Sequence, residues 1–281
     1  MQATPPATTP GSGAPSTAEH RCAPVPAPGD PTAGIVAFRH VPGTTRAAYN
    51  RIYRGEGIRH PDRFWRWILD LVEAVPGQRL LDVACGEGQL VHHAAARGLD
   101  AHGVDLSDVA LAIGRRASPA APFAVANGEA LPYADAAFDV VTNMGSLEHY
   151  EDPVAGAAEM ARVVTADGRV CLHVPNLFGL RWNVAHGWRR GDVPDDGQPI
   201  QRYGSRAQWT RVLAAGGLEV ERVLGLEETM FDPVDARALL GMAAHPTRLF
   251  VPLMRWMPVD MSSILVFVCR KALSSTSPAR R

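Results

Sequence analysis

The sequence is poor in the features that mark several large classes of protein. Its four cysteines, among 281 residues, are scattered without C-x-x-C spacing, which argues against a disulfide framework. No apolar run reaches the roughly 18–20 residues that a membrane-spanning helix needs. The formal net charge is −1, so charge favours neither nucleic acid nor an anionic membrane as a partner. These absences predict a cytoplasmic protein with reduced thiols, no membrane span and no nucleic-acid partner.

Two further absences concern catalytic chemistry. Histidine and cysteine do not cluster at metal-ligand spacing, and Asp152, Asp195 and Asp196 are isolated or in loops, so we expect no metal site. Ser146 stands near His149 in the sequence, but the G-x-S-x-G turn of a hydrolase is missing. The sequence therefore predicts neither a metalloenzyme nor a serine hydrolase.

The two ends of the chain differ in composition from its middle. Residues 1–35 hold 8 of the 23 prolines among Ala, Thr, Ser and Gly, without an apolar period, and are expected to be disordered. Residues 274–281 are expected to form a flexible tail. Because 46% of the whole chain is hydrophobic, which is typical of globular proteins, one folded domain is predicted over residues 36–273.

The segment RLLDVACGEGQL, residues 79–90, is the most informative part of what is present. A short apolar run that contains Asp82 leads into Gly86 and Gly88, after which the apolar positions adopt helical spacing. A strand, a tight turn and a helix start place backbone N–H groups and the positive end of a helix against a ligand. Glycine suits the turn because a Cβ would block the backbone angles and the approach of the ligand.

A second acid follows where a nucleotide ribose would need it. GLDAHGVDLS reads as a strand ending at Asp105, and 105 − 88 places this acid 17 residues after Gly88. A carboxylate at this strand tip can accept hydrogen bonds from both ribose hydroxyls. The dinucleotide fingerprint G-x-G-x-x-G would require glycine where Val91 stands, which disfavours an NAD-dependent oxidoreductase. A smaller, cationic nucleoside without phosphates fits better.

Hydrophobic periodicity predicts alternating strands and helices through the rest of the chain. Helices are expected at 45–57, 61–75, 88–97, 107–116, 153–163 and 205–217, and strands at 79–84, 100–105, 122–126, 138–144, 168–174, 218–228 and 262–272. Strands separated by helices imply an α/β fold, a doubly wound, mostly parallel sheet with helices on both faces. Two long insertions, 176–205 and 230–260, interrupt this pattern, and the second is a helical insertion before the last strand.

Five segments in this order resemble the class I S-adenosylmethionine-dependent methyltransferases. They are DVACGEG, GVDLS, ANGEALPYADAAFDVV, NMGSLEHYEDP and EMARVVTADGRVCLHVPN. The resemblance covers roughly residues 45–225 and is greatest to the small-molecule branch that includes the ubiquinone and menaquinone biosynthetic enzymes. It implies a Rossmann-like sheet ending in an antiparallel hairpin, and S-adenosyl-L-methionine as the cofactor.

The resemblance also implies roles for individual residues at the strand ends. Asp82 would hold the ammonium group of the cofactor, directly or through water, and Asp105 its ribose hydroxyls. Asn127 stands where relatives usually carry an aspartate, and its amide oxygen can still accept a hydrogen bond from the adenine amino group. The complete expected cofactor site is Asp82, Ala84, Gly86, Gly88, Asp105, Leu106, Asn127, Gly128, Glu129, Met144 and Gly145.

One histidine is the candidate catalytic residue. His149 ends the triplet LEH that is common after the fourth strand in this family, and its neutral imidazole can take a hydroxyl proton near pH 7. A hydrogen-bonded, structural role for His149 is the alternative. His173 is expected to pack within the sheet, whereas His92 and His93 lie on the first helix after the glycine turn, away from the strand tips.

Candidate substrate contacts fall in three regions. Tyr49 and Tyr53 lie four residues apart on one helix face. In the insertion 176–205, an apolar wall of tryptophans beside arginines could meet a carboxylate or phosphate, the alternative being a solvated loop with its tryptophans tucked on the core. The insertion 230–260 offers an apolar surface for a substrate cap or a homodimer contact. The residues concerned are Trp182, Trp188, Arg181, Arg189 and Arg190 in the first insertion, and Met230, Phe231, Met242, Phe250, Met254, Trp256 and Met257 in the second.

Taken together, these features predict methyl transfer to a small molecule in specialised-metabolite or quinone-like biosynthesis. O-methylation is favoured, with C- or N-methylation possible. A sulfonium methyl is already activated, so catalysis would consist largely of positioning the acceptor in line with it in a dry pocket. The alternative is a non-catalytic protein of the same fold that binds S-adenosylmethionine or S-adenosylhomocysteine, or acts as a scaffold.

Overall fold

The computed structural model describes residues 29–40, 45–55, 57–195, 197–227 and 258–272. Most of the segment predicted to be disordered, most of the insertion 230–260 with its proposed cap or homodimer contact, and the tail 274–281 lie outside these residues.

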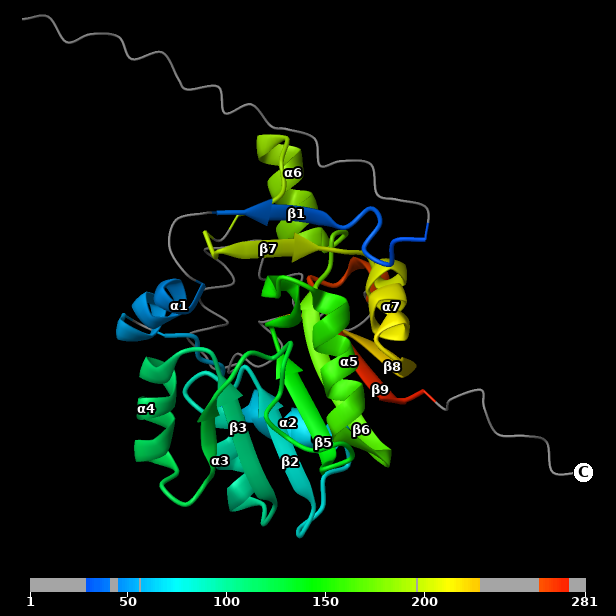
Figure 1. Ribbon diagram of the computed structural model, residues 1–281. Helices are drawn as coiled ribbons and strands as arrows, with labels where there is room; N and C mark the ends of the chain where they lie inside the picture. Colours follow the sequence, from blue (N-terminus) through cyan, green and yellow to red (C-terminus); the bar gives the residue numbers. More distant parts are fainter. Residues whose placement is uncertain (1–28, 41–44, 56, 196, 228–257, 273–281) are drawn as a thin grey trace, which may run out of the picture.

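The described residues form a seven-stranded sheet and a separate two-stranded sheet (Figure 1). The order of the large sheet is β4-β3-β2-β5-β6-β9-β8. Its strands are β2 (Arg79–Val83), β3 (Asp100–Asp105), β4 (Phe123–Val125), β5 (Phe138–Met144), β6 (Val164–Pro175), β8 (Leu218–Leu226) and β9 (Ile264–Lys271). The pairs from β4 to β6 are parallel, and β9 runs antiparallel to both β6 and β8. This confirms the predicted Rossmann-like sheet and its terminal antiparallel hairpin.

Helices cover both faces of this sheet, which is why its central strands read as almost continuous apolar runs. Leu80 and Leu81 are both fully buried, and each belongs to a different hydrophobic core because successive strand residues point to opposite faces. The core around Leu80 includes Phe64 and Ile68 of α2. The helices are α1 (Thr45–Arg54), α2 (Asp62–Leu71), α3 (Gln89–Ala96), α4 (Asp108–Ala117), α5 (Pro153–Val163), α6 (Ala185–Arg190) and α7 (Arg206–Ala215).

Helix α7 begins where the sequence predicts, at a capping box. The Ser205 hydroxyl accepts from the Gln208 backbone N–H, and the Gln208 side chain accepts from the Ser205 backbone N–H. Asp152 caps α5 in a related way, by accepting from the N–H groups of Val154 and Ala155. Local capping chemistry explains why these helix starts could be read from the sequence.

Residues 29–35 correct the predicted boundary of the disordered segment. The Asp30 carboxylate accepts from the backbone N–H of Thr32 at 2.8 Å and closes a turn. The carbonyl of Ala33 then accepts a hydrogen bond from Arg211 of α7 at 3.0 Å. The chain is therefore ordered before residue 36, because a polar turn attaches it to a distant helix.

The insertion 176–205 is not a single loop. It contains a five-residue π-helix, η2 (Leu180–Val184), followed by α6 and by strand β7 (Ile200–Tyr203). Strand β7 pairs antiparallel with β1 (Val36–Arg39), and neither strand was predicted. Each is only four residues long and finds its partner far away in the sequence, so neither leaves a clear periodic signal. Figure 1 shows the β1–β7 pair above the large sheet, with α6 projecting beyond it.

Candidate active site

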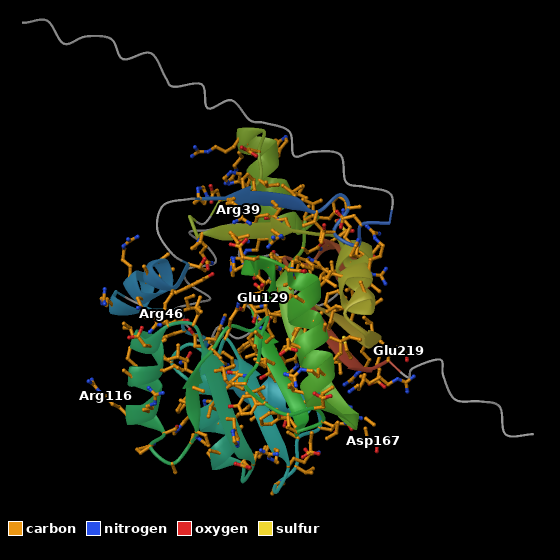
Figure 2. The ribbon with its side chains drawn as sticks, viewed as in Figure 1. Arg39, Arg46, Arg116, Glu129, Asp167 and Glu219 are labelled. Atoms are coloured by element: carbon orange, nitrogen blue, oxygen red, sulfur yellow. The ribbon has the colours of Figure 1, made fainter. Side chains whose placement is uncertain are left out.

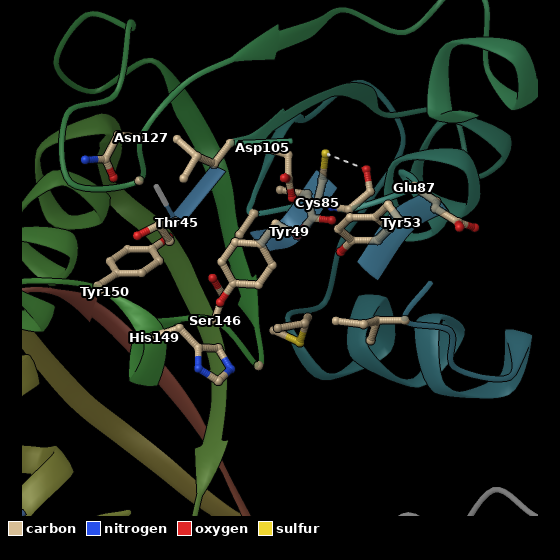
Figure 3. Close-up of a pocket in the computed structure, with 18 of the residues that line it drawn as sticks. Thr45, Tyr49, Tyr53, Cys85, Glu87, Asp105, Asn127, Ser146, His149 and Tyr150 are labelled. Carbon is tan, nitrogen blue, oxygen red and sulfur yellow. Dashed lines mark hydrogen bonds between the residues drawn. The ribbon is translucent and has the colours of Figure 1, made fainter. Parts of the chain in front are cut away.

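A cleft lies at the carboxyl ends of β2, β3 and β5, bordered by α1 and by the segment that leads into β7 (Figure 3). The residues that line it come from the glycine turn after β2, the tip of β3, the turn after β4 and the turn after β5. Ten of the residues predicted to bind the cofactor line it, namely Asp82, Ala84, Gly86, Asp105, Leu106, Asn127, Gly128, Glu129, Met144 and Gly145. Parallel strands deliver these segments to one edge of the sheet.

Gly88 is the predicted cofactor residue that does not line the cleft. It occupies the N-cap of α3 with a φ of +72°, and a Cβ built there would lie 2.7 Å from the Phe123 ring. Glycine at this position therefore serves the packing of α3 against β4. The contact of Gly88 with the cofactor stays a prediction, beside the packing role that the structure shows.

Asp105 joins the glycine turn to the start of α4. Its Oδ2 accepts from the Gly86 backbone N–H at 2.8 Å, and its Oδ1 accepts from the Ser107 N–H at 2.7 Å. Burial raises the pKa of Asp105, and these backbone hydrogen bonds oppose the rise. A carboxylate has about four acceptor sites, so Asp105 can hold the loop and still accept from two ligand hydroxyls.

Asp82 is the second buried acid of the cleft. Its Oδ1 accepts from the Thr142 hydroxyl at 2.7 Å, and only 3% of its surface is exposed. Burial raises the pKa of Asp82 to about 7, opposed by the Thr142 hydrogen bond, and the Asp105 charge adds to the rise. An ammonium group beside Asp82 would favour its ionised form, so this position suits a cationic ligand.

The two tyrosines of α1 face different parts of the cleft (Figure 3). Tyr53 lies over the glycine turn, where a Cβ at Gly86 would come within 2.6 Å of its hydroxyl. Burial, and next the Asp105 charge, raise the pKa of Tyr53. Tyr49 lies 6.4 Å from the His149 ring, centroid to centroid, and its hydroxyl donates to Gln198 Oε1 at 3.2 Å. Of this predicted substrate pair, only Tyr49 is beside the candidate base.

The turn after β4 is shaped by contacts within the protein. Asn127 Oδ1 accepts from the Glu129 N–H at 3.1 Å, and Glu129 Oε1 accepts from the Glu151 N–H at 2.8 Å. A Cβ at Gly128 would lie 2.0 Å from the Tyr150 hydroxyl, so only glycine fits there. Figure 2 shows Glu129 between the large sheet and β1, the strand that carries Arg39. The amide of Asn127 is thus held at the rim of the cleft.

His149 ends a short 3₁₀ helix after β5 and lies in the cleft wall. Its Nδ1 is hydrogen-bonded to the carbonyl of Ile200 in β7. Because a carbonyl can only accept, this contact assigns the proton of the neutral ring to Nδ1 and leaves the lone pair on Nε2. Nε2 lies 3.7 Å from Glu148 Oε1. The geometry fits a base whose tautomer is set by the backbone.

Several lining residues were missed from the sequence, among them four that lie outside the turns at the strand ends. Thr45, His60, Trp65 and Gln198 belong to α1, the start of α2 and the approach to β7, none of which carries a glycine turn or a strand-end acid. Tertiary folding alone brings them to the cleft, because the pairing of β7 with β1 positions Gln198 opposite Tyr49.

Other predicted residues lie away from the cleft. Trp182 and Trp188 are 63% and 86% exposed, and with Arg181 they lie on η2 and α6. None of the three lines the cleft, and their contact with the substrate stays a prediction. Neither tryptophan is tucked on the core, so that alternative reading of the insertion is wrong. His173 packs within β6 as predicted, and burial lowers its pKa to about 3.

In the described part of the chain, no group of three or more His, Cys, Asp or Glu residues could hold a metal ion. No helix in the same residues is both long and apolar enough to cross a membrane.

The sequence matches the family model of a methyltransferase domain over residues 81–172, the region that contains the glycine turn, Asp105 and His149. It is 41% identical to a demethylmenaquinone methyltransferase of Renibacterium salmoninarum over 110 residues, which are 39% of this chain and 46% of the relative. It is 30% identical to a ubiquinone biosynthesis O-methyltransferase of Thiobacillus denitrificans over 171 residues, 57% of this chain and 72% of the relative.

The chain spans about half the length of the first curated relatives that it matches. Among solved structures, it resembles an S-adenosylmethionine-dependent methyltransferase from Mesorhizobium loti with a TM-score of 0.53 and 18% identity, covering 74% of this chain and 97% of that one. At this identity the likeness bears on the fold alone.

Proposed function

This chain belongs to the class I S-adenosylmethionine-dependent methyltransferases, and from that premise we propose that it methylates a small molecule. The observation that carries the proposal is the contact of Asp105 with Gly86. It fixes the glycine turn beside a carboxylate that can accept hydrogen bonds from two ribose hydroxyls. Asp82 lies in the same cleft, where its carboxylate can bind a cation. A cationic nucleoside without phosphates suits this pair of acids.

Three polar groups of the cleft bind the cofactor in this proposal. Asp105 binds the ribose hydroxyls, Asp82 binds the ammonium group, and the Asn127 amide oxygen accepts from the adenine amino group. The cofactor supplies a methyl group already activated on a sulfonium. The chain itself therefore has to orient the acceptor, exclude water and remove a proton where the acceptor carries one.

We propose an oxygen acceptor on a quinone-like or related specialised metabolite. Tyr49, Gln198 and His149 form the wall beside which it would lie, and the His149 Nε2 lone pair can take a hydroxyl proton. The names of the relatives support a quinone-like acceptor and include both O-methylation and C-methylation. The thiols of Cys85, Cys171 and Cys269 are free, and free thiols are typical of proteins in the reducing cytoplasm, which is the compartment that we propose.

Cofactor binding is tested by calorimetry with S-adenosylhomocysteine and with NAD. We expect binding of S-adenosylhomocysteine that Asp105→Ala weakens by about 1–3 kcal/mol, the scale of lost hydrogen bonds to a charged group. Asp100→Ala is the matched control, because Asp100 lies at the opposite, exposed end of the same strand. Binding of NAD without S-adenosylhomocysteine would contradict the proposal.

Catalysis is tested by release of S-adenosylhomocysteine from S-adenosylmethionine in the presence of hydroxylated quinone-like acceptors. We expect product with at least one such acceptor, identified by mass spectrometry as an O-methyl ether. Tight cofactor binding without product across the panel would instead favour the non-catalytic alternative.

The role of His149 is tested by His149→Ala. If this imidazole is the base, turnover should fall by about 10²–10⁴-fold with cofactor affinity unchanged, and the activity of the parent should rise with pH as the ring becomes neutral. His93→Ala, on α3 and outside the cleft lining, is the control. Normal turnover of the His149 variant would point to a carbon acceptor or to positioning alone, and loss of cofactor binding would point to a structural role.

A further inference from the structure

The segment 178–190, which we call the η2–α6 surface, exposes an unusual amount of apolar side chain. Five of the nine large apolar side chains that are exposed in the described residues lie here: Phe178, Leu180, Trp182, Val184 and Trp188. Single exposed apolar residues are ordinary, but a group of five on one short segment is typical of a surface that binds a protein, a membrane or a ligand.

The charge of this surface has one sign. Arg181, Arg189 and Arg190 lie in the segment and no acid does, although the whole chain has a net charge of −1. Arg189 and Arg190 make no ion pair with any residue that the structure describes. Together with Trp182, the three arginines line a hollow beside α6. The surface therefore combines aromatic rings with two arginines, Arg189 and Arg190, that have no ion-pair partner among the described residues and can bind an anion.

The position of the surface matches a docking role. Figure 1 shows α6 projecting beyond the β1–β7 pair, so that it meets a flat partner before the body of the molecule does. The chain then returns from α6 to Gln198 and Ile200, which hold Tyr49 and His149 at the cleft. A partner of the η2–α6 surface would thus bind a segment that is separated by only a few residues from the acceptor side of the cleft.

We propose that the η2–α6 surface docks on a lipid bilayer that contains anionic phospholipids. Tryptophan rings favour the boundary between headgroups and acyl chains, and arginines bind lipid phosphates. Helix α6 has six residues and can lie in the interface without crossing it. A second copy of the chain fits less well, because a symmetric contact would bring two sets of three arginines together. The docking stands apart from the proposed methyl transfer and can be tested without activity.

The first test is cosedimentation of the full chain with vesicles of phosphatidylcholine, alone or mixed equally with phosphatidylglycerol. We expect binding to the anionic vesicles that added salt weakens. Arg189→Gln with Arg190→Gln should weaken it roughly 30-fold, from about fivefold per arginine. The control, Arg66→Gln with Arg116→Gln, removes the same charge from exposed positions on α2 and α4 and should bind like the parent. No binding, or equal loss in both variants, would overturn the proposal.

The second test asks whether the tryptophans enter the bilayer. Brominated acyl chains should quench tryptophan fluorescence in the parent, and Trp182→Phe with Trp188→Phe should retain binding while losing most of the quenching. Equal quenching in parent and variant would overturn the insertion. Light scattering provides a further check, since a dimer abolished by Trp182→Ala with Trp188→Ala would assign the surface to a second copy. Preferential, salt-sensitive capture of an RNA duplex by this surface would likewise overturn a lipid partner.

Discussion

The glycine turn at residues 84–88 and the η2–α6 surface at residues 178–190 differ in how they present polar and apolar groups. In the turn, backbone N–H groups and the Asp105 carboxylate converge on each other and on a cleft. On the η2–α6 surface, tryptophans and arginines point outward from a segment that projects from the molecule. The glycine turn has a backbone conformation that its own sequence sets, so the positions of its residues can be predicted. A segment rich in aromatic residues and arginine shows only which ligands its side chains can bind, not where those side chains lie.

The largest expected change in the free energy of unfolding comes from replacing one of two tryptophans, one buried and one on the η2–α6 surface. Trp209 of α7 is fully buried and donates to the Pro175 carbonyl at 3.1 Å, whereas Trp188 is largely exposed. Trp209→Ala should lower the free energy of unfolding by about 3–5 kcal/mol, because it leaves a cavity and an unpaired carbonyl. Trp188→Ala should change it by less than about 0.5 kcal/mol.

Urea denaturation of both variants measures this difference. A comparable loss in Trp188→Ala would show that the η2–α6 surface is packed against other parts of the chain, and the comparison would fail.

The next effect concerns the dependence of stability on pH. The pKa of Asp82, raised to about 7 by burial, exceeds the ordinary aspartate value of 3.8. Between these two values the folded state binds a proton that the unfolded state has released. Stability contributed by the protonated group is present below about pH 4 and is lost as pH rises toward 7. At about 1.4 kcal/mol per pH unit, the loss amounts to at most about 4 kcal/mol.

Asp82→Asn should flatten this decline, because an amide does not titrate and still accepts from Thr142. Urea denaturation between pH 4 and pH 8 gives the two profiles. Asp105 adds a decline of the same sign to both profiles, and because the two charges interact, the difference between the profiles measures Asp82 together with its coupling to Asp105. Parallel profiles would contradict the raised pKa of Asp82.

The smallest effect lies within the glycine turn. Ala84 has a φ of +60°, in the left-handed region that favours glycine. Ala84→Gly should relieve this strain and raise the free energy of unfolding by up to about 1 kcal/mol, reduced by the greater freedom of glycine in the unfolded chain. Thermal unfolding monitored by circular dichroism detects the change. A lower melting temperature would show that the Ala84 methyl group contributes more by packing than its backbone costs.

The large sheet and the row of expected cofactor positions follow from local patterns in the sequence. Glycine turns, capping side chains and apolar periods are local, and parallel strands bring their carboxyl ends to one edge in whatever order they pair. This is why Asp82, Asp105 and Met144 could be placed together before the structure was known. For the same local reason the packing role of Gly88 could not be read from the sequence, since a glycine needed for ligand approach and one needed for helix packing look alike there.

The opposite wall of the cleft and the conformation of the first insertion depend on contacts between segments that are far apart in the chain. Strands β1 and β7 pair although most of the described chain lies between them in the sequence. That pairing places the Ile200 carbonyl against His149 Nδ1, which sets the tautomer of the neutral ring, and brings Gln198 to Tyr49. Trp182 and Trp188 are exposed because the segment that carries them, between β6 and β7, projects beyond the β1–β7 pair and does not fold over the cleft. Residue type sets which contacts a side chain can make, but contacts between distant segments depend on backbone paths that no local pattern encodes.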